Sequence, residues 1–319
     1  MKAMAQRSWA AGAPLELLEL PTPEPRAREL RVRVHAIGVN PVDWKMRTRG
    51  PLRLAARLIG PRPPVVFGVD FAGIVDAVGP GVAGVAPGDR VVGGTNFARR
   101  QRGSYADTVV VRDDQVATLP GDLDLVVAGA LPVAGVTAWR CVVEVGRLQA
   151  GQRALILGAS GGVGQFAVQL VKARGGRAVG VCSTRNIALV EGLGADAVLD
   201  YTQGDPLAQA RAHGPYQVVV DCVGGYPGAA CRALLGPGGR HVMIAAEGLR
   251  ETLNILVPPF TSRSVLGQPT APRLRAIVDA VASGAVRVQI AETMPLREAE
   301  RALERSKSGR MTGKIVLVP

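Results

Sequence analysis

The chain of 319 residues has few cysteines, few histidines and few aromatic residues. Its four cysteines stand far apart and form no CxxC pair, which argues against a disulfide framework and for small buried thiols. Aromatic residues make up only 4% of the chain, and none is interleaved with the densest arginine clusters. A stacking surface for single-stranded nucleic acid is therefore not indicated, and we expect no nucleic-acid partner.

Long apolar runs are also missing. No run approaches the ~18 residues that a membrane-spanning helix needs. A secretory signal peptide would have an uninterrupted apolar core, and the N-terminal stretch has none before Glu16. We expect a cytoplasmic protein that does not enter a membrane.

Lysine is scarce as well. Only five residues are lysine, so arginine supplies nearly all of the positive charge behind the net charge of +12. A basic surface concentrates anionic partners, including phosphate-bearing cofactors and thioester carriers. The alternative is that the arginine excess reflects the base composition of the genome.

The N-terminal part of the chain is rich in short β-type runs separated by glycine and proline. The length favours two domains, and 47% hydrophobic residues with 20% charged residues are typical of a globular protein. Strands are expected at residues 30–39, 71–79 and 89–94, and twice within 104–120. We expect a compact antiparallel β domain there.

Strands and helices alternate in the following part of the chain. Buried strands are expected at residues 153–158, 177–182 and 196–201, each followed by a helix. This order gives a parallel doubly wound sheet and places the chain in the α/β class. An amphipathic helix at 272–283 and a last strand at 313–319 follow.

A glycine-rich run, ILGASGGVGQF, spans residues 156–166. It joins an expected strand to an expected helix, which is the setting of a dinucleotide-binding fingerprint rather than of a structural glycine turn. Gly161 would let the backbone approach a pyrophosphate, Gly164 would let the helix pack closely on the strand, and the helix N-terminus would supply N–H donors. The predicted cofactor contacts here are Ser160, Gly161, Gly162, Val163 and Gly164.

The residues at the end of the next strand, GVCSTRN, favour NADPH over NADH. It has no acid at its tip, where an NAD site usually carries Asp or Glu. Ser183, Thr184 and Arg185 offer two hydroxyls and a guanidinium, which suit a 2′-phosphate. We therefore expect NADPH, unless Arg185 merely points to solvent.

Motifs along almost the whole chain resemble those of the medium-chain dehydrogenase/reductase superfamily, and most of all its quinone oxidoreductase branch. They are GVNPVDWKMR (38–47), VVFGVDFAGIVDAVGPGV (65–82), PGDRV (87–91), GSYAD (103–107), LPVAGVTAW (131–139), GASGGVG (158–164), VLDY (198–201), VDCVGG (220–225) and GKIVLVP (313–319). The resemblance implies a GroES-like β-rich catalytic domain of residues 1–122 and 268–319 and a Rossmann domain of residues 123–267. It also implies NADPH in the cleft between them and a homodimer through the sheet edge near residues 264–268.

The sequence departs from the zinc alcohol dehydrogenases of that superfamily at their metal ligands. Where those relatives have a cysteine and a Gly-His-Glu segment, this chain has Asn40 and Gly68-Val69-Asp70. Residues 92–112 contain no cysteine, so the structural zinc site is missing too. The three histidines, His35, His213 and His241, lie on expected strands or a connecting helix and supply no ligand set. We expect no metal site.

The resemblance also implies roles for residues outside the glycine run. Asn40, Asp43 and Thr137 would be catalytic, with the Asn40 amide donating to a substrate carbonyl, although Asp43 fits a turn or capping role equally well. Lys314 would contact a phosphate or ribose of the cofactor, unless it is simply solvated. The further cofactor contacts implied in this way are Tyr201, Cys222, Val223 and Gly224.

One feature of the relatives is absent. Zinc-free members often place a tyrosine shortly after the Asn-Pro-x-Asp segment, but the stretch WKMRTRGPLRL contains none, so that proton donor is missing. The arginine-rich stretch from 47 to 62 would instead meet an anionic substrate such as a coenzyme A thioester. Replacing Arg49, Arg53 and Arg57 by alanine tests this hypothesis through acyl-CoA kinetics.

Metal-free hydride transfer limits the expected reaction. An electrophilic carbon or ring can accept hydride if hydrogen-bond donors stabilise the developing oxyanion and a proton follows. We expect an NADPH-dependent reductase of quinones or of the C=C bond of α,β-unsaturated carbonyls. An enoyl-thioester reductase of lipid, polyketide or branched-acid metabolism fits the same residues, and a cofactor-binding protein with little turnover is a further alternative.

Overall fold

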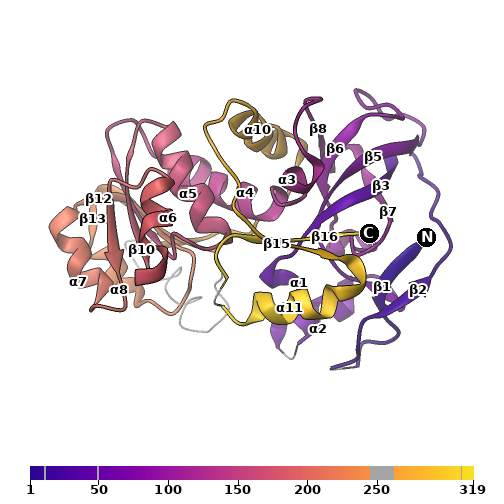
Figure 1. Ribbon diagram of the computed structural model, residues 1–319, viewed down its shortest axis with the longest axis horizontal. Helices are drawn as coiled ribbons and strands as arrows, with labels where there is room; N and C mark the ends of the chain where they lie inside the picture. The colour runs from indigo at the N-terminus through magenta and orange to yellow at the C-terminus, as the bar shows by residue number, and fades with distance from the viewer. Residues whose placement is uncertain (11, 49, 245–261, 310) are drawn as a thin grey trace. The chain divides into compact units, whose positions relative to one another are not determined.

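The structure, a computed structural model, describes residues 1–319 except 11, 49, 245–261 and 310. The chain forms two compact units (Figure 1). Unit 1 comprises Met1–Val133, Gln268–Ala282 and Ile290–Pro319, and unit 2 comprises Ala134–Gly267 and Ser283–Gln289. Relative to the boundaries expected from the sequence, residues 123–133 lie in unit 1 and residues 283–289 lie in unit 2.

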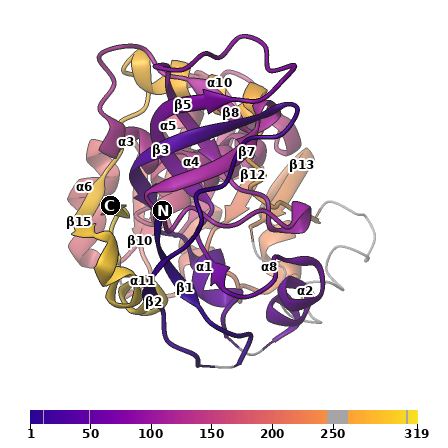
Figure 2. The same cartoon turned by 90° about the vertical axis from the view of Figure 1, so that its right-hand side faces the viewer.

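Unit 1 is built on two β-sheets. Its strands are β1 (Lys2–Gln6), β2 (Glu16–Glu19), β3 (Glu29–Gly38), β4 (Val65–Val66), β5 (Asp70–Val78), β6 (Arg90–Gly94), β7 (Thr108–Arg112), β8 (Val116–Thr118), β15 (Ile290–Pro295) and β16 (Lys314–Val318). The larger sheet has the order β15-β16-β3-β5-β6-β8, and the smaller has the order β2-β1-β4. Figure 2 shows β3 between β5 and β7, its two antiparallel partners.

The antiparallel pairing expected for the N-terminal strands is confirmed, and the C-terminal segment adds a parallel pair at one edge of the larger sheet. β15 and β16 pair in parallel, whereas the other strand pairs of unit 1 are antiparallel. A helix, α11 (Ala299–Lys307), connects these two strands. Parallel neighbours need such a crossover because a tight hairpin can join only antiparallel strands.

The core of unit 1 follows the alternation along β3. Leu30, Val32 and Val34 are buried on one face, as the period of two in a strand requires. The helices of unit 1 besides α11 are α1 (Pro41–Lys45), α2 (Pro51–Ile59), α3 (Leu125–Gly129) and α10 (Ala271–Ala282), and α4 (Pro132–Trp139) continues into unit 2. Neither α1 nor α2 was expected from the sequence; α1 has only five residues, too few to show a helical period.

The described residues of unit 2 form one parallel sheet of six strands. They are β9 (Arg153–Leu157), β10 (Arg177–Cys182), β11 (Ala197–Asp200), β12 (Tyr216–Asp221), β13 (Leu235–Met243) and β14 (Ser262–Ser264). Their spatial order is β11-β10-β9-β12-β13-β14. This is the doubly wound order, in which the chain adds strands outward from β9 on one side and then outward from β12 on the other. The α/β class and the parallel doubly wound sheet are confirmed.

Helices connect the strands of this sheet, as Figure 1 shows for α5 and α6. The α-helices described in unit 2 are α5 (Gly162–Ala173), α6 (Ile187–Gly192), α7 (Pro206–Ala210) and α8 (Gly228–Arg232), with a π-helix at Arg140–Val145. The central strand β9 is buried from Ala154 to Leu157, as expected of a strand covered on both faces. Among the described residues, no helix has the length and apolar character needed to cross a bilayer.

Candidate functional site

The glycine run of unit 2 forms the turn between β9 and α5. Gly158 has φ +82°, a backbone conformation that favours glycine. A Cβ atom on Gly164 would lie 2.1 Å from the Gly158 carbonyl oxygen and 2.8 Å from the Ala159 Cα. The first turn of α5 therefore needs glycine to sit this close to the end of the strand, in agreement with the role expected for Gly164.

The N-terminus of α5 is tied to the tip of the next strand by a side chain that the sequence reasoning missed. Asn186 Nδ2 donates to Ser160 Oγ at 3.0 Å and to Ser183 Oγ at 3.3 Å. The backbone N–H groups of the first turn of α5, from Gly162 to Gly164, lack intrahelical acceptors, as in every helix. Asn186 thus links two segments expected at the cofactor, and only contact in the folded sheet could reveal it.

The end of β12 lies beside the glycine run. β9 pairs with both β10 and β12, and a Cβ on Gly158 would meet Val223 Cγ2 at 2.7 Å. The Asp221 carboxylate accepts the backbone N–H groups of Val223 at 2.9 Å and Gly224 at 2.8 Å, which holds the turn that contains Cys222. The structure therefore brings the segment 222–224 to the glycine run, between β9 and β12, where the order in which strands are added to the sheet changes side.

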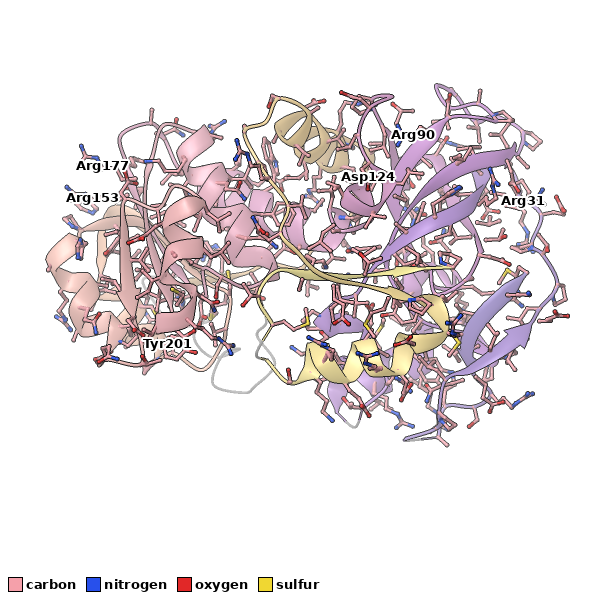
Figure 3. All side chains as sticks on the ribbon, in the orientation of Figure 1. Arg31, Arg90, Asp124, Arg153, Arg177 and Tyr201 are labelled. Atoms are coloured by element: carbon pink, nitrogen blue, oxygen red, sulfur yellow. The ribbon has the colours of Figure 1, made fainter. Side chains whose placement is uncertain are left out.

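The tip of β10 carries the residues expected at the 2′-phosphate. Thr184 Oγ1 donates to Asp200 Oδ2 at 2.5 Å, and Asp200 ends the neighbouring strand β11. Tyr201 follows Asp200, and its side chain is 52% exposed on unit 2 (Figure 3). The roles of Ser183, Thr184, Arg185 and Tyr201 in binding the cofactor stay predictions.

A buried polar cluster occupies unit 1 around Asn40. Lys314 Nζ donates to Asn40 Oδ1 at 2.5 Å and to the Val39 carbonyl at 3.0 Å, and it lies 3.6 Å from Asp70 Oδ2. Asn40 Nδ2 donates to Asp70 Oδ2 at 2.8 Å and to the Gly38 carbonyl at 3.2 Å. Asn40, Asp70 and Lys314 are each exposed by 3% or less.

These contacts fix the orientation of the Asn40 amide. Lys314 can only donate and a charged Asp70 can only accept, so the amide oxygen faces the former and the nitrogen faces the latter. Both amide hydrogens thus have acceptors inside the protein, and donation to a substrate carbonyl would require giving one of them up. Burial lowers the pKa of Lys314 and raises that of Asp70, and the attraction between the two charges opposes both shifts.

The position of Lys314 changes how its predicted role is viewed. The family resemblance implies that this residue contacts the cofactor, with a solvated lysine as the alternative. The lysine is not solvated, since it is 3% exposed and its hydrogen bonds go to Asn40 and Val39 in unit 1. A cofactor contact stays a prediction, whereas the link to Asn40 is observed.

Asp43 is fully buried beside this cluster and caps a helix. Its Oδ2 accepts the backbone N–H of Asn40 at 2.8 Å, at the start of α1, and the hydroxyl of Tyr105 at 3.0 Å. Its Oδ1 has no hydrogen-bond partner among the described residues. Burial, reinforced by the charge of Asp70, raises the pKa of Asp43 to about 7, and burial raises the pKa of Tyr105. The capping alternative is therefore observed, and Tyr105 is a partner that the sequence reasoning missed.

The remaining predicted residues are placed as follows. Thr137 lies on α4 and is 4% exposed, and its catalytic role stays a prediction. His241 is buried on β13 against Ser262, and burial lowers its pKa to about 4. In the part of the chain that the structure describes, no three His, Cys, Asp or Glu side chains gather as a metal site would need. The four cysteines are free thiols.

Two of the arginines in the stretch from 47 to 62 have acceptors within unit 1. Arg47 pairs with Glu300 at 2.9 Å, and Arg53 donates to the Trp9 carbonyl. Arg57 is exposed on α2, whereas Arg49 lies outside the described residues. Internal partners reduce what Arg47 and Arg53 can offer to an anionic substrate. The other arginines are widely spread over each unit, as the labelled Arg31, Arg90, Arg153 and Arg177 illustrate (Figure 3).

Comparison with known proteins gives consistent relatives over the full chain. Residues 26–121 match the alcohol dehydrogenase GroES-like domain, and residues 193–317 match the zinc-binding dehydrogenase family. The chain is 33% identical to the chloroplast envelope quinone oxidoreductase homolog of Arabidopsis thaliana, covering 100% of this chain and 98% of the relative. It is 32% identical to the mitochondrial NAD(P)H oxidoreductase RTN4IP1 of Mus musculus, covering 91% and 81%. The quinone oxidoreductase structure from Coxiella burnetii superposes with a TM-score of 0.90 at 29% identity, covering 100% and 99%.

The zinc in the description of one matched family does not suit the residues of this chain. The Asp70 carboxylate already accepts from Asn40 and from the Val133 backbone, and the Lys314 ammonium lies beside it. A zinc ion needs three or four N, S or O ligands, and an adjacent ammonium would repel it. The motifs, the two folds and the full-length relatives agree on one assignment. The chain belongs to the medium-chain dehydrogenase/reductase superfamily, in its quinone oxidoreductase branch.

Proposed function

We propose that this protein is an NADPH-dependent, zinc-independent reductase that transfers hydride to a quinone or to the C=C bond of an α,β-unsaturated carbonyl. One observation carries the proposal: the glycine run and the turn at 222–224 meet at the carboxyl ends of β9 and β12. Ligands of open parallel sheets bind where the order of strand addition changes side. Relatives named quinone oxidoreductase and NAD(P)H oxidoreductase support the class of reaction.

Unit 2 would bind the dinucleotide. The N–H groups at the start of α5 would receive the pyrophosphate, and Asn186 would hold Ser160 in place beside it. Ser183, Arg185 and Tyr201 would bind the adenosine end. When bound, the cofactor supplies the hydride, and these residues supply position and charge.

Unit 1 would supply the proton. Asp43 is the buried carboxyl group whose pKa is raised to about 7, so a large share of it is neutral at physiological pH. The unpartnered Oδ1 is the atom that would hold this proton, while Oδ2 stays bonded to Tyr105 and to the Asn40 backbone. Asp43 would thus fill the place of the tyrosine that the sequence lacks.

Steady-state oxidation of NADPH against three acceptors tests the proposed function. We expect turnover with a soluble quinone or a simple enone and weaker turnover with an enoyl-CoA, because Arg47 and Arg53 are held by internal acceptors. Dialysis against a zinc chelator should leave the rate unchanged. If enoyl-CoA is clearly the best acceptor, the enoyl-thioester alternative replaces the proposal. Tight binding of NADPH without turnover on any acceptor would favour the binding-protein alternative.

Location and assembly are part of the same proposal. The cytoplasmic location stays a prediction, since relatives named for chloroplast and mitochondrion belong to the same branch. A homodimer through the edge of the unit 2 sheet is supported by two features: β14 is an edge strand among the described strands, and Leu266 just after it is 70% exposed. Light scattering coupled to size-exclusion chromatography of the purified chain measures this directly.

A further inference from the structure

A carboxylate lies at the tip of β10, although that strand itself ends without an acid. β10 and β11 pair in parallel, with Cys182 opposite Asp200, so both strands end at the same level. The Asp200 carboxylate accepts a hydrogen bond from Thr184 Oγ1 at 2.5 Å. It also accepts two from Thr202, from the hydroxyl at 2.7 Å and from the backbone N–H at 2.8 Å. The third strand thereby delivers the acid that the second strand lacks.

These hydrogen bonds keep the Asp200 carboxylate charged. The bond from Thr184 holds the pKa of Asp200 below its ordinary value. At neutral pH a negative charge therefore lies within hydrogen-bond distance of Thr184, which the sequence predicts to contact a 2′-phosphate.

The bond to Asp200 also changes what Thr184 can offer to a ligand. A threonine hydroxyl has a single hydrogen, and here that hydrogen is directed to the carboxylate. Thr184 can then only accept further hydrogen bonds. A ribose 2′-hydroxyl can donate to Thr184 or Asp200, whereas a 2′-phosphate meets an occupied donor and a like charge.

We propose that Asp200 is a specificity-determining residue that weakens binding of a 2′-phosphorylated dinucleotide relative to its unphosphorylated form. Arg185, two positions beyond Ser183, would act as the opposing positive charge. The protein would thus use NADH as well as NADPH, with the balance set by two opposite charges at the adenosine end. This inference rests on the proposed function, because it requires that unit 2 binds a dinucleotide.

The test compares the dissociation constants of NADPH and NADH for the purified protein and for Asp200→Asn, measured by isothermal titration calorimetry. Loss of one charge close to the 2′-position should raise the preference for NADPH about fivefold, because one unfavourable charge contact is removed. NADH affinity should change little. The shift should shrink at 1 M salt, where surface charges are screened.

Two further variants serve as controls. Asp122→Asn removes an exposed carboxylate of unit 1 and should leave the NADPH to NADH ratio unchanged. Thr202→Val removes one partner of Asp200 and keeps the charge, so it should leave most of the discrimination in place. Melting temperatures of all variants verify that each is folded.

The outcomes separate this inference from the proposed function. A ratio that does not move in folded Asp200→Asn overturns the role of Asp200, while NADPH binding by the unmodified protein leaves the proposed function standing. Failure of the unmodified protein to bind either dinucleotide overturns both. A ratio that moves toward NADH in Asp200→Asn also contradicts the proposal, since the sign of the charge effect would then be reversed.

Discussion

The polar cluster around Asn40 in unit 1 and the polar strand ends of unit 2 at Thr184 and Tyr201 are organised in opposite ways. In unit 1, Asn40, Asp70 and Lys314 are buried and each contacts the other two. In unit 2, Thr184 and Tyr201 lie exposed at strand ends. A buried charge must be matched inside the protein, whereas an exposed one can be exchanged with water or with a ligand.

This difference separates stability from binding. Removing one member of the unit 1 cluster leaves another polar group buried without its partner, which destabilises the fold strongly. Changing a residue at the strand ends of unit 2 should alter dinucleotide affinity with little effect on folding. Each of the following predictions tests one side of that contrast.

The largest effect is expected for Lys314→Met. The substitution leaves the Asp70 carboxylate buried without its ammonium partner and should lower the free energy of unfolding by about 3–5 kcal/mol. Urea denaturation measures this cost. The double variant Lys314→Met with Asp70→Asn removes both charges, so it should be more stable than the single variant. If the double variant is the less stable of the two, the ion pair is not what holds this cluster.

The second effect concerns a closely packed glycine of unit 2. Gly164→Ala places a Cβ 2.1 Å from the Gly158 carbonyl oxygen, so α5 must move away from β9. We expect about 1–3 kcal/mol of destabilisation and a clear loss of dinucleotide affinity. Gly192→Ala is the matched control, since a Cβ at that helical position meets nothing within 4 Å. Equal behaviour of the two variants would contradict the close packing described here.

A separate effect is a dependence of stability on pH through Asp43. Its pKa is about 7 in the folded protein and near the ordinary 3.8 when unfolded, so the folded state binds the extra proton between these values. Asp43 therefore lowers stability progressively as pH rises from about 4 to 7, by at most about 1.4 kcal/mol per pH unit. Asp43→Asn should flatten the curve over this window. Denaturation of both proteins at several pH values measures the difference.

The smallest effect is expected on α2. Arg57 is exposed, so Arg57→Ala should change the free energy of unfolding by less than about 0.5 kcal/mol. Arg53→Ala removes a donor from the Trp9 carbonyl and should cost about 1 kcal/mol. Thermal unfolding of the two variants side by side checks the order. A larger loss for Arg57 would mean that the exposed side of this helix has a structural role.

Much of unit 2 was predictable because its signals are local. A buried apolar run followed by a glycine-rich turn and a helix is specified within residues 156–166, and the structure has β9, the turn and α5 there. Unit 1 was less predictable. Its helix α1 is too short to show a helical period, and the parallel pairing of β15 with β16 depends on where the C-terminal segment returns to the sheet.

The sequence by itself determined the α/β class, the glycine turn with its close helix, and the family motifs, because each depends on neighbours in the chain. Only the tertiary structure decided which polar groups meet. It joined Lys314 to Asn40 across the length of the chain, Tyr105 to Asp43, and Asp200 to the strand end that lacks an acid. Strand pairing and burial set those contacts, and both depend on residues far apart in sequence.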